Sequence, residues 1–446
     1  MELAGLRGGL RGISRGERRK EVNKAMSEID RRKFVGAAAG ALAGAWLAAG
    51  CKERAKSPVA PAGQPVRLGV IGPGSRGQEL MRTFLRVPGV RFTGLCDVYE
   101  PRFAEARDIT REDTPTFRDY RALLAAKDID AVIVATPLKF HGEHVVAALE
   151  SGRHVYGEKS MAMTVEECDR IVDAVRRSGK NYQVGVQYHY ATWYRDTLQR
   201  VREGKLGKIT HVYAEWHRNN DWRRPVPNSG DVQLERLINW RMYKEYSLGL
   251  LAELGSHHIS FANEIFGGAP ESVVGSGGVD YWKDGRETYD NVQVTYRYPG
   301  GQTLFFSAIT SNAHEGAQIR VYGTEGTAVL TEGDAVLYSE AKKLKASSVT
   351  KLLIDHGVMT GASYMAEMPY RGKGEEVPVP EDVEGNANYL ACESFVRSIV
   401  NRQKPEADER EGWAEAVAVI LGHKAIEEGK RIWFREHTSR VNGVGA

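Results

Sequence analysis

The sequence predicts an α/β protein with two folded domains: an N-terminal doubly wound parallel sheet, and a C-terminal α+β domain with an open, mainly antiparallel sheet. Between residues 66 and 187, short apolar runs alternate with helical patterns, which is typical of parallel strands joined by crossover helices. From residue 188 onward, alternating runs such as Asn291–Tyr298 follow one another, as half-buried antiparallel strands do. The length of 446 residues also exceeds what one compact core usually holds.

Composition narrows the range of functions. The net charge is only +3, with 42% hydrophobic and 27% charged residues, so the chain lacks the strongly basic character of nucleic-acid-binding proteins. The 4 cysteines form no C-x-x-C pair, which indicates neither a zinc site nor a disulfide framework. We therefore look for function in local motifs.

The first 51 residues have the pattern of an export signal. A basic region precedes the pair Arg31–Arg32 and Phe34, and an apolar run from 37 to 49 follows; this order resembles a twin-arginine signal. The run ends at Cys51 in a lipobox-like sequence, and it is shorter than the roughly 20 residues that span a bilayer. We expect an exported, periplasmic or cell-envelope lipoprotein that meets the membrane only through a lipid on Cys51.

Two further expectations concern this region. Met26 lies directly before the signal, so the start of translation stays open between Met1 and Met26. Residues 52–65 are rich in alanine and proline and are expected to be a linker. The folded domains would then cover 66–187 and 188–446.

The first apolar run, Val66–Ile71, leads directly into a glycine-rich loop with G-x-G-x-x-G spacing. The first glycine of such a loop permits a tight turn, the second lets the backbone approach a pyrophosphate, and the third lets helix and strand pack closely. The context of strand, turn and helix favours a dinucleotide-binding Rossmann domain over a plain turn. The expected cofactor-binding residues of this loop are Gly72, Pro73, Gly74, Ser75, Arg76 and Gly77.

An acidic residue follows the second run, Val90–Cys96. Asp97 stands where a carboxylate can accept hydrogen bonds from an adenosine ribose. A carboxylate there repels a 2′-phosphate, so the sequence favours NAD, while the nearby Arg102 leaves NADP open.

The later strands end in polar residues. Ligands of doubly wound sheets bind beyond the carboxyl ends of the strands, where several such side chains are expected to meet. The cofactor-binding candidates are Thr136, Pro137, His141, Glu158, Lys159 and Gln187.

Four stretches together resemble the Gfo/Idh/MocA oxidoreductase family. They are G-P-G-S-R-G at 72–77, C-D-V at 96–98, A-T-P-L-K-F-H at 135–141 and G-E-K-S at 157–160. In that family an E-K-P motif supplies a lysine beside the nicotinamide and the substrate. The resemblance implies this role for Lys159, whereas Ser160 stands where the family usually has proline.

The resemblance extends to the stretch 240–266. The family's pattern D-x-G-x-H-x-x-D is matched at Gly255 and His257, while Glu253 and Ser260 replace the two aspartates. On a helix, residues 253 and 257 share one face. We expect His257 to be the general acid or base, since histidine titrates near neutral pH, and Glu253 to orient or tune it. No third ligand for a metal is evident by spacing, so no metal is expected.

A set of aromatic and polar residues suits carbohydrate. Aromatic faces stack on sugar rings and guanidinium groups donate paired hydrogen bonds, although packing between domains is an alternative role for many of these side chains. The expected substrate-binding residues are Tyr188, Arg218, Trp222, Trp240, Arg241 and His258.

Three functions remain open. The first is an NAD(P)-dependent oxidoreductase acting on a sugar, glycoside or cyclitol, with a tightly held cofactor because none is replenished outside the cytoplasm. The second is glycoside cleavage without net redox change, as in the family's NAD-dependent α-N-acetylgalactosaminidases, although those have P-T-H-G where this chain has G-S-H-H at 255–258. The third is a non-catalytic sugar-binding lipoprotein. An exposed sheet face in the second domain makes a homo-oligomer plausible.

Overall fold

The structure is a computed structural model that describes residues 65–228, 230–331, 333–340, 353, 355–357, 374–377, 386–438, 440–441 and 444–445. The predicted export signal, its Cys51 and all of the predicted linker except Pro65 lie outside these residues. No helix within them combines the length and the apolarity needed to cross a membrane.

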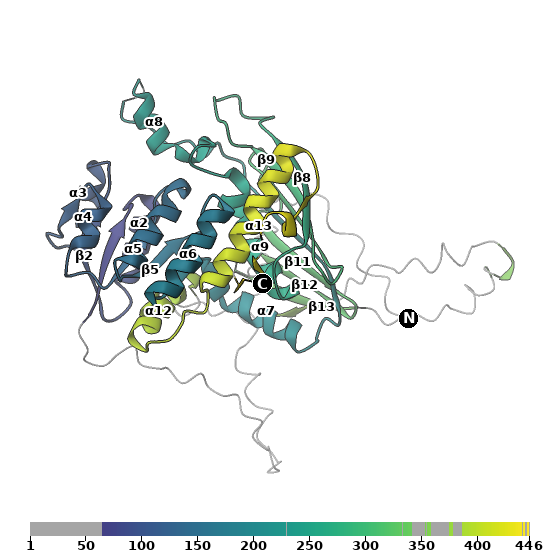
Figure 1. Cartoon of the computed structure of the whole chain (residues 1–446). Helices are drawn as coiled ribbons and strands as arrows, with labels where there is room; N and C mark the ends of the chain where they lie inside the picture. Colours follow the sequence, from purple (N-terminus) through teal and green to yellow (C-terminus); the bar gives the residue numbers. More distant parts are fainter. Residues whose placement is uncertain are drawn as a thin grey trace, which may run out of the picture. The chain divides into compact units, whose positions relative to one another are not determined.

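The first sheet confirms the predicted doubly wound domain (Figure 1). Its strands are parallel and lie in the order β3-β2-β1-β4-β5-β6. The strands are β1 Val66–Ile71, β2 Val90–Cys96, β3 Thr116–Phe117, β4 Ala131–Val134, β5 His154–Glu158 and β6 Tyr182–Gly185. The order reverses between β1 and β4, and a ligand-binding crevice forms at such a point.

Helices cover both faces of this sheet. The helices are α2 Ser75–Phe84, α3 Pro101–Thr110, α4 Tyr120–Ala125, α5 His141–Glu150 and α6 Val165–Ser178. Side chains of α2 and α3 share one buried cluster with the late helix α12 Ala387–Val400, while α4, α5 and α6 contribute to a second. Local chemistry sets the helix ends: Thr164 accepts a hydrogen bond from the Glu167 amide at the start of α6, and Gly179 ends it with φ of 63°.

Strand register brings the functional ends together. Ile71 of β1 pairs with Cys96 of β2 and with Val134 of β4. Because these strands are parallel and in register, the residues that follow them emerge at one edge of the sheet. The glycine-rich loop, Asp97 and Thr136 follow at this edge.

The second sheet is mainly antiparallel, as predicted. It has more strands than the first sheet and contains one parallel pair. Its order is β14-β13-β12-β11-β7-β10-β9-β8-β15, and β7 and β10 pair in parallel. The strands are β7 Ile209–His217, β8 Ser272–Gly278, β9 Asn291–Arg297, β10 Thr303–Ile309, β11 Ala317–Gly323, β12 Gly326–Thr331, β13 Ala335–Ser339, β14 Glu375–Glu376 and β15 Ile432–Trp433.

Alternation gives this sheet one covered face. Val292, Val294 and Tyr296 of β9 point into the core, and Tyr296 donates to the Ala418 carbonyl of α13 Glu409–Glu428 at 2.9 Å. The other helices of this domain are α7 Thr192–Arg202, α8 Val232–Ile238 and α9 Ser256–Phe266. Tyr213 of β7, on the opposite face, is 44% exposed.

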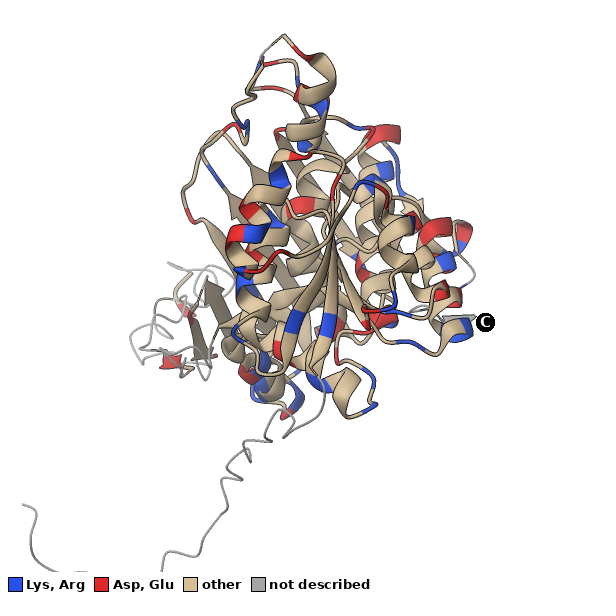
Figure 2. Ribbon diagram, turned by 90° about the vertical axis from the view of Figure 1, so that its left-hand side faces the viewer, with Lys and Arg blue, Asp and Glu red and all other residues tan. Residues whose placement is uncertain are grey.

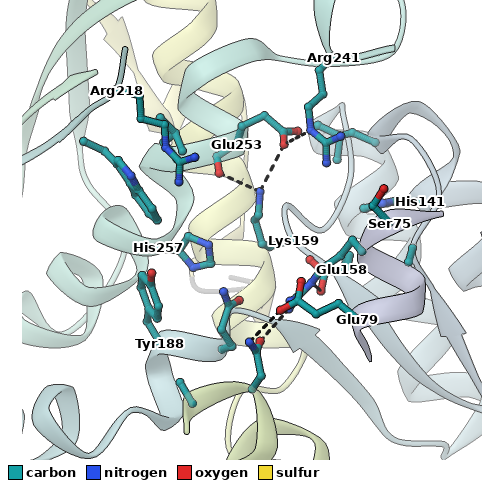
Figure 3. A pocket seen from close by; sticks show the side chains of 18 of the residues that line it. Ser75, Glu79, His141, Glu158, Lys159, Tyr188, Arg218, Arg241, Glu253 and His257 are labelled. Atoms are coloured by element: carbon teal, nitrogen blue, oxygen red, sulfur yellow. Dashed lines mark hydrogen bonds and ion pairs between the residues drawn. The ribbon is translucent and has the colours of Figure 1, made fainter. Parts of the chain in front are cut away.

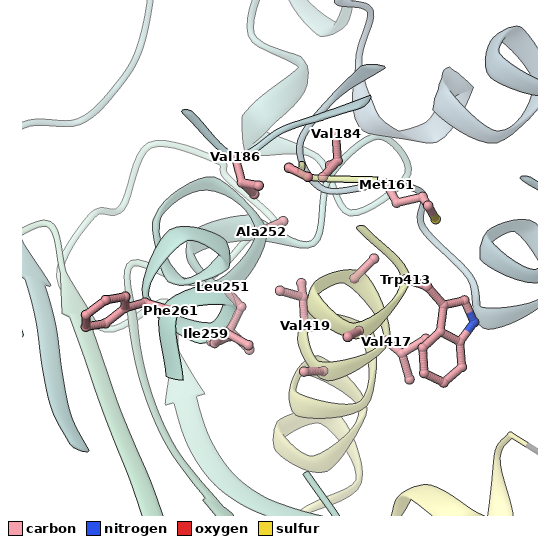
Figure 4. Close-up of a cluster of buried hydrophobic side chains, with 14 of the residues drawn as sticks. Met161, Val184, Val186, Leu251, Ala252, Ile259, Phe261, Trp413, Val417 and Val419 are labelled. Carbon is pink, nitrogen blue, oxygen red and sulfur yellow. The ribbon is translucent and has the colours of Figure 1, made fainter. Parts of the chain in front are cut away.

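Helix α13 joins the two domains. It packs against α6 of the first domain and against α9 and β8 of the second, and Figure 4 shows its side chains Trp413, Val417 and Val419 in the cluster between them. Acidic and basic residues are intermingled over the helices (Figure 2), as the small net charge of +3 implies.

Candidate active site

Two adjoining cavities open at the carboxyl edge of the parallel sheet. The dinucleotide groove, of about 770 Å³, is lined by Gly72, Gly74, Asp97 and Pro137 among others. The inner cavity, of about 670 Å³, is lined by Lys159, Gln187, Glu253 and His257 among others (Figure 3). Both are lined by Ser75, Arg76, Ala135, Thr136, Arg224, Trp240 and Arg241. The two cavities therefore adjoin each other.

The glycine loop has the shape that a dinucleotide requires. Gly72 has φ of +86°, and a Cβ on Gly77 would lie 2.4 Å from the Gly72 carbonyl oxygen, so both positions need glycine for the turn and the packing. A Cβ on Gly74 would meet nothing within 4 Å, because this residue faces the groove. The first amides of α2 follow directly, and a helix N-terminus favours phosphate.

Asp97 lies in the groove with Arg102. Its Oδ1 accepts a hydrogen bond from the Tyr99 amide at 2.8 Å, and burial raises its pKa despite this bond. The Arg102 guanidinium lies 3.1 Å from the Glu105 carboxylate. The carboxylate of Asp97 lines the groove where an adenosine ribose would lie, so the residues present fit NAD.

His141 is a buried residue that lines the inner cavity. Its Nδ1 and Nε2 lie 2.8 and 2.9 Å from the carbonyl oxygens of Ser160 and Thr136. Burial lowers its pKa, and because a neutral imidazole donates through only one ring nitrogen, the ring bonds one of these two carbonyl groups at a time.

Arg76 and Glu158, both expected to touch the cofactor, bind each other. Arg76 Nε donates to Glu158 Oε1 at 2.8 Å, and Nη2 donates to Asn388 at 3.1 Å. Burial acts to lower the pKa of Arg76, but Glu158 and other acidic groups outweigh it and raise that pKa. The pair therefore offers little net charge to a ligand.

Lys159 is held at the centre of the inner cavity. Its Nζ donates to the carbonyl oxygens of Ala252 and Glu253, each at 3.0 Å, and lies 3.9 Å from Glu253 Oε2. Arg241 Nε donates to the same carboxylate oxygen at 2.6 Å. Burial acts to raise the pKa of Glu253, yet the charges of Arg241 and Lys159 hold it below its usual value. The carboxylate therefore remains ionised and steadies the ammonium group (Figure 3). The peptide bond between Lys159 and Ser160 is cis.

His257 lines the same cavity as Lys159. Its ring centroid is 4.8 Å from that of Tyr188 and 5.8 Å from that of Trp216, and its side chain is nearly fully buried. Burial and the charge of Lys159 lower its pKa well below the usual value. The imidazole is therefore neutral and can accept a proton, but it is a weaker base than the histidine titrating near neutral pH that the sequence predicted.

The expected contact between Glu253 and His257 is not formed. Residues Leu251–Gly255 form a π-helix, and α9 begins only at Ser256. The wider turn changes the angle between the two side chains, so Glu253 binds Arg241 and Lys159. Nδ1 of His257 is buried without a hydrogen-bond partner in the described part of the chain.

The predicted substrate-binding residues divide into two groups. Tyr188, Arg218, Trp240 and Arg241 line the inner cavity. By contrast, Trp222 and His258 line neither cavity within the described ranges. His258 is 3% exposed and stacks on Trp216, and burial lowers its pKa to about 3; it is an interior residue.

Pro73 and Gly77 also line neither cavity within the described ranges. The Pro73 carbonyl accepts a hydrogen bond from Gln78 Nε2 at 3.2 Å. Pro73 and Gly77 therefore support the conformation of the loop and do not line the groove.

Sequence reasoning missed Arg224. Its Nη1 donates to Ser75 Oγ at 2.5 Å, beside the expected pyrophosphate site. The Asn239 side chain holds its backbone through bonds of 2.7 and 3.0 Å. The surrounding segment has no periodicity, so no local signal could identify this arginine.

Two clusters of histidine and glutamate within the described residues have side-chain atoms close enough together to hold a metal ion. None of their residues lines either cavity. The clusters are His189, Glu264 and Glu411, and Glu215, His217 and Glu315.

Comparison with protein families gives two adjacent matches. Residues 66–186 match the model of the Gfo/Idh/MocA oxidoreductase family with an NAD-binding Rossmann fold. Residues 194–329 match the Gfo/Idh/MocA C-terminal domain.

Curated relatives include a glycosyl hydrolase family 109 protein of Shewanella baltica, 33% identical over 220 residues, or 44% of this chain and 48% of that protein. An α-N-acetylgalactosaminidase of Shewanella oneidensis is 32% identical over 193 residues, or 42% of this chain and 41% of that protein. The matches thus span about half the length of these relatives.

Solved structures share the fold. Levoglucosan dehydrogenase in complex with NADH and levoglucosan aligns with a TM-score of 0.65 at 17% identity, over 83% of this chain and 100% of that one. Aldose-aldose oxidoreductase from Caulobacter crescentus gives the same score and identity over 83% and 99%. With both domains matched in order and the dinucleotide groove in place, the chain belongs to the Gfo/Idh/MocA oxidoreductase family.

Proposed function

We propose that this protein is an NAD(P)-dependent oxidoreductase that oxidises a hydroxyl group of a sugar, glycoside or cyclitol. The observation that carries the proposal is that Lys159 and His257 line one cavity, which adjoins the dinucleotide groove. A non-catalytic binding protein would not need a neutral histidine and a fixed ammonium group in the same cavity.

The side chains have complementary roles. His257, neutral through burial, accepts the hydroxyl proton, and Lys159 stabilises the negative charge that develops on the oxygen. Glu253 and Arg241 keep the ammonium group in place. The bound dinucleotide supplies the acceptor for the hydride that leaves the carbon.

The walls of the inner cavity suit a ring rich in hydroxyl groups. Tyr188 stacks on Trp216 with centroids 6.0 Å apart, and the Arg218 guanidinium lies 5.2 Å from the Trp216 ring. Trp240 supplies a further aromatic surface. Such surfaces stack on the apolar faces of sugars while arginine donates to their hydroxyl groups.

We also propose that the dinucleotide is held tightly, as export with a bound cofactor demands. Arg224 reaches Ser75 across the groove, and Lys139 forms an ion pair of 2.6 Å with Glu245. These contacts tie the second domain to the first beside the cofactor. Periplasmic or envelope localisation through Cys51 and a homo-oligomer formed on the exposed sheet face are parts of the same proposal.

Glycoside cleavage without net redox change is the second candidate. The relatives named as glycosyl hydrolase family 109 and α-N-acetylgalactosaminidase favour it. A retained cofactor also suits a cycle that restores its own redox state.

One experiment separates these functions. The dinucleotide is identified after denaturation of purified protein, and intact protein is incubated with a panel of sugars and glycosides without added cofactor. Keto product limited to one equivalent per bound dinucleotide supports the oxidoreductase, whereas free sugar released over many turnovers refutes it in favour of cleavage. Binding without product, equal in Lys159→Ala, leaves a binding protein.

A further inference from the structure

Two positions at which the chain departs from the family's pattern have partners on one helix. Ser160 Oγ donates to Glu415 Oε1 at 2.5 Å, across 255 positions of sequence. Ser260 Oγ donates to Glu411 Oε1. Glu411 and Glu415 lie one turn apart on α13, so this helix supplies a carboxyl group behind Lys159 and another behind the helix of His257.

Glu415 is enclosed within the protein. Its side chain is 0% exposed, and its Oε2 has no hydrogen-bond partner within the described part of the chain. Burying a carboxyl group with one unpaired oxygen costs free energy of folding.

Helix α13 comes close to the first domain at Gly412. A Cβ at this position would lie 2.9 Å from Met161 Cε and 3.2 Å from Val184 Cβ. Figure 4 shows Met161 and Val184 facing α13. Glycine thus lets the helix come near enough for Glu415 to reach the residue that follows Lys159.

The Lys159 segment is held at three points. Its ammonium group binds the carbonyl oxygens of Ala252 and Glu253. The next residue, Ser160, is held at its carbonyl by His141 and at its hydroxyl by Glu415. Removal of the Glu415 contact frees the backbone adjacent to the lysine.

We propose that Glu415 is a positioning residue for Lys159, which fixes the lysine through the hydroxyl of Ser160 and adds a negative charge behind the ammonium group when ionised. This rests on the role proposed for Lys159, but the test below measures the lysine directly and needs no substrate.

The charge on Glu415 changes within the pH range in which labelling can be measured. Burial raises its pKa to about 8, although the hydrogen bond from Ser160 and the charge of Lys159 oppose this. The titratable groups that interact with it are Lys159, Cys168, Tyr182, Tyr296 and Glu411. Burial raises the pKa of the Cys168 thiol and of the Tyr182 and Tyr296 phenols. It also raises the pKa of the Glu411 carboxyl group, to about 7. The carboxyl groups therefore gain charge between neutral and mildly alkaline pH.

Competitive acetylation of Lys159 tests the proposal. Protein as purified is labelled with acetic anhydride from pH 6 to pH 10, and mass spectrometry quantifies modification of Lys159 against a reference amine. In Glu415→Gln we expect Lys159 to react about three- to tenfold faster than in wild type above pH 8, because a neutral amide replaces the ionised acceptor that holds the Ser160 hydroxyl and, with it, the lysine segment. At pH 6 the two proteins should react alike, since glutamine reproduces the neutral carboxyl group.

Glu409→Gln is the matched control. Glu409 is a buried carboxylate on the same helix, 5% exposed, and pairs with Lys404 at 3.0 Å, away from Lys159. Its variant should follow the wild-type labelling curve. Identical curves for Glu415→Gln and wild type would overturn the proposal.

Ser160→Ala provides a second route should Glu415→Gln not fold. It removes the hydroxyl alone and should raise labelling of Lys159 severalfold even at pH 6, because the segment is loosened; unchanged labelling would refute the positioning role. Failure of the proposed function is distinguishable, because a wild-type protein that oxidises no sugar still gives these labelling curves.

Discussion

The glycine loop offers a sharp test, because two of its glycines are required for different physical reasons. In Gly74→Ala the new methyl group points into open space in the dinucleotide groove, with no atom within 4 Å. In Gly77→Ala the methyl group lies 2.4 Å from the Gly72 carbonyl oxygen. The first change should therefore affect the cofactor and the second the fold.

The expected magnitudes follow from the geometry. Gly74 has φ of −75° and ψ of −167°, which alanine adopts without strain, so Gly74→Ala should leave the free energy of unfolding of the dinucleotide-free protein within about 1 kcal/mol of wild type. The clash at Gly77 involves backbone that cannot swing aside, and it should cost about 1–3 kcal/mol or more. A methyl group in the pyrophosphate path should weaken NADH binding at least about tenfold, or ~1.4 kcal/mol.

Two measurements decide the matter. Urea unfolding of dinucleotide-free protein gives the stability of each variant, and fluorescence titration with NADH gives its affinity. If Gly74→Ala binds NADH as wild type does, the pyrophosphate does not pass over this residue and the placement of the dinucleotide is wrong. A Gly77→Ala protein as stable as wild type would refute the packing argument.

Four further outcomes are expected. Asp97→Ser should shift the ratio of NADPH to NADH affinity about tenfold toward the phosphorylated form, because a carboxylate repels a 2′-phosphate; an unchanged ratio in parallel titrations would contradict this. His257→Asn should lower kcat about 10²–10⁴-fold with dinucleotide content unchanged, and a similar loss of dinucleotide would assign the histidine to binding instead. Arg224→Ala should release dinucleotide about tenfold faster, followed as fluorescence decay under dilution, since the variant loses the contact with Ser75. Because folding raises the pKa of Glu415 from 4.5 to about 8, its contribution to stability is complete below about pH 4.5 and is lost as pH rises through 8; urea unfolding at pH 6 and pH 8.5 should differ less in Glu415→Gln than in wild type.

Local spacing was sufficient to predict the first domain. The glycine loop, Asp97 and Thr136 each follow a buried run, and one rule about the carboxyl ends of parallel strands places them at the same edge. In the structure Ile71 pairs with Cys96 and with Val134, so the three strands end at the same level of the sheet.

The second half of the site depends on geometry that spacing does not encode. The interval between Glu253 and His257 suggests neighbours on a regular helix, but the π-helix at Leu251–Gly255 changes the angle between them. The parallel pairing of β7 with β10 is equally invisible, because alternation is the same in parallel and antiparallel strands exposed on one face. Arg224 reaches Ser75 only because two distant segments meet.

One departure from the family's pattern nevertheless carries information about the core. A hydroxyl group placed where proline is usual, next to a strand end in the core, must find an acceptor once it is buried. Ser160 therefore implies a buried partner, although the sequence cannot say which one. The partner is Glu415 on α13. The helix thus joins the domains and also presents its carboxyl group to the segment that carries Lys159, so packing and positioning are performed by the same surface.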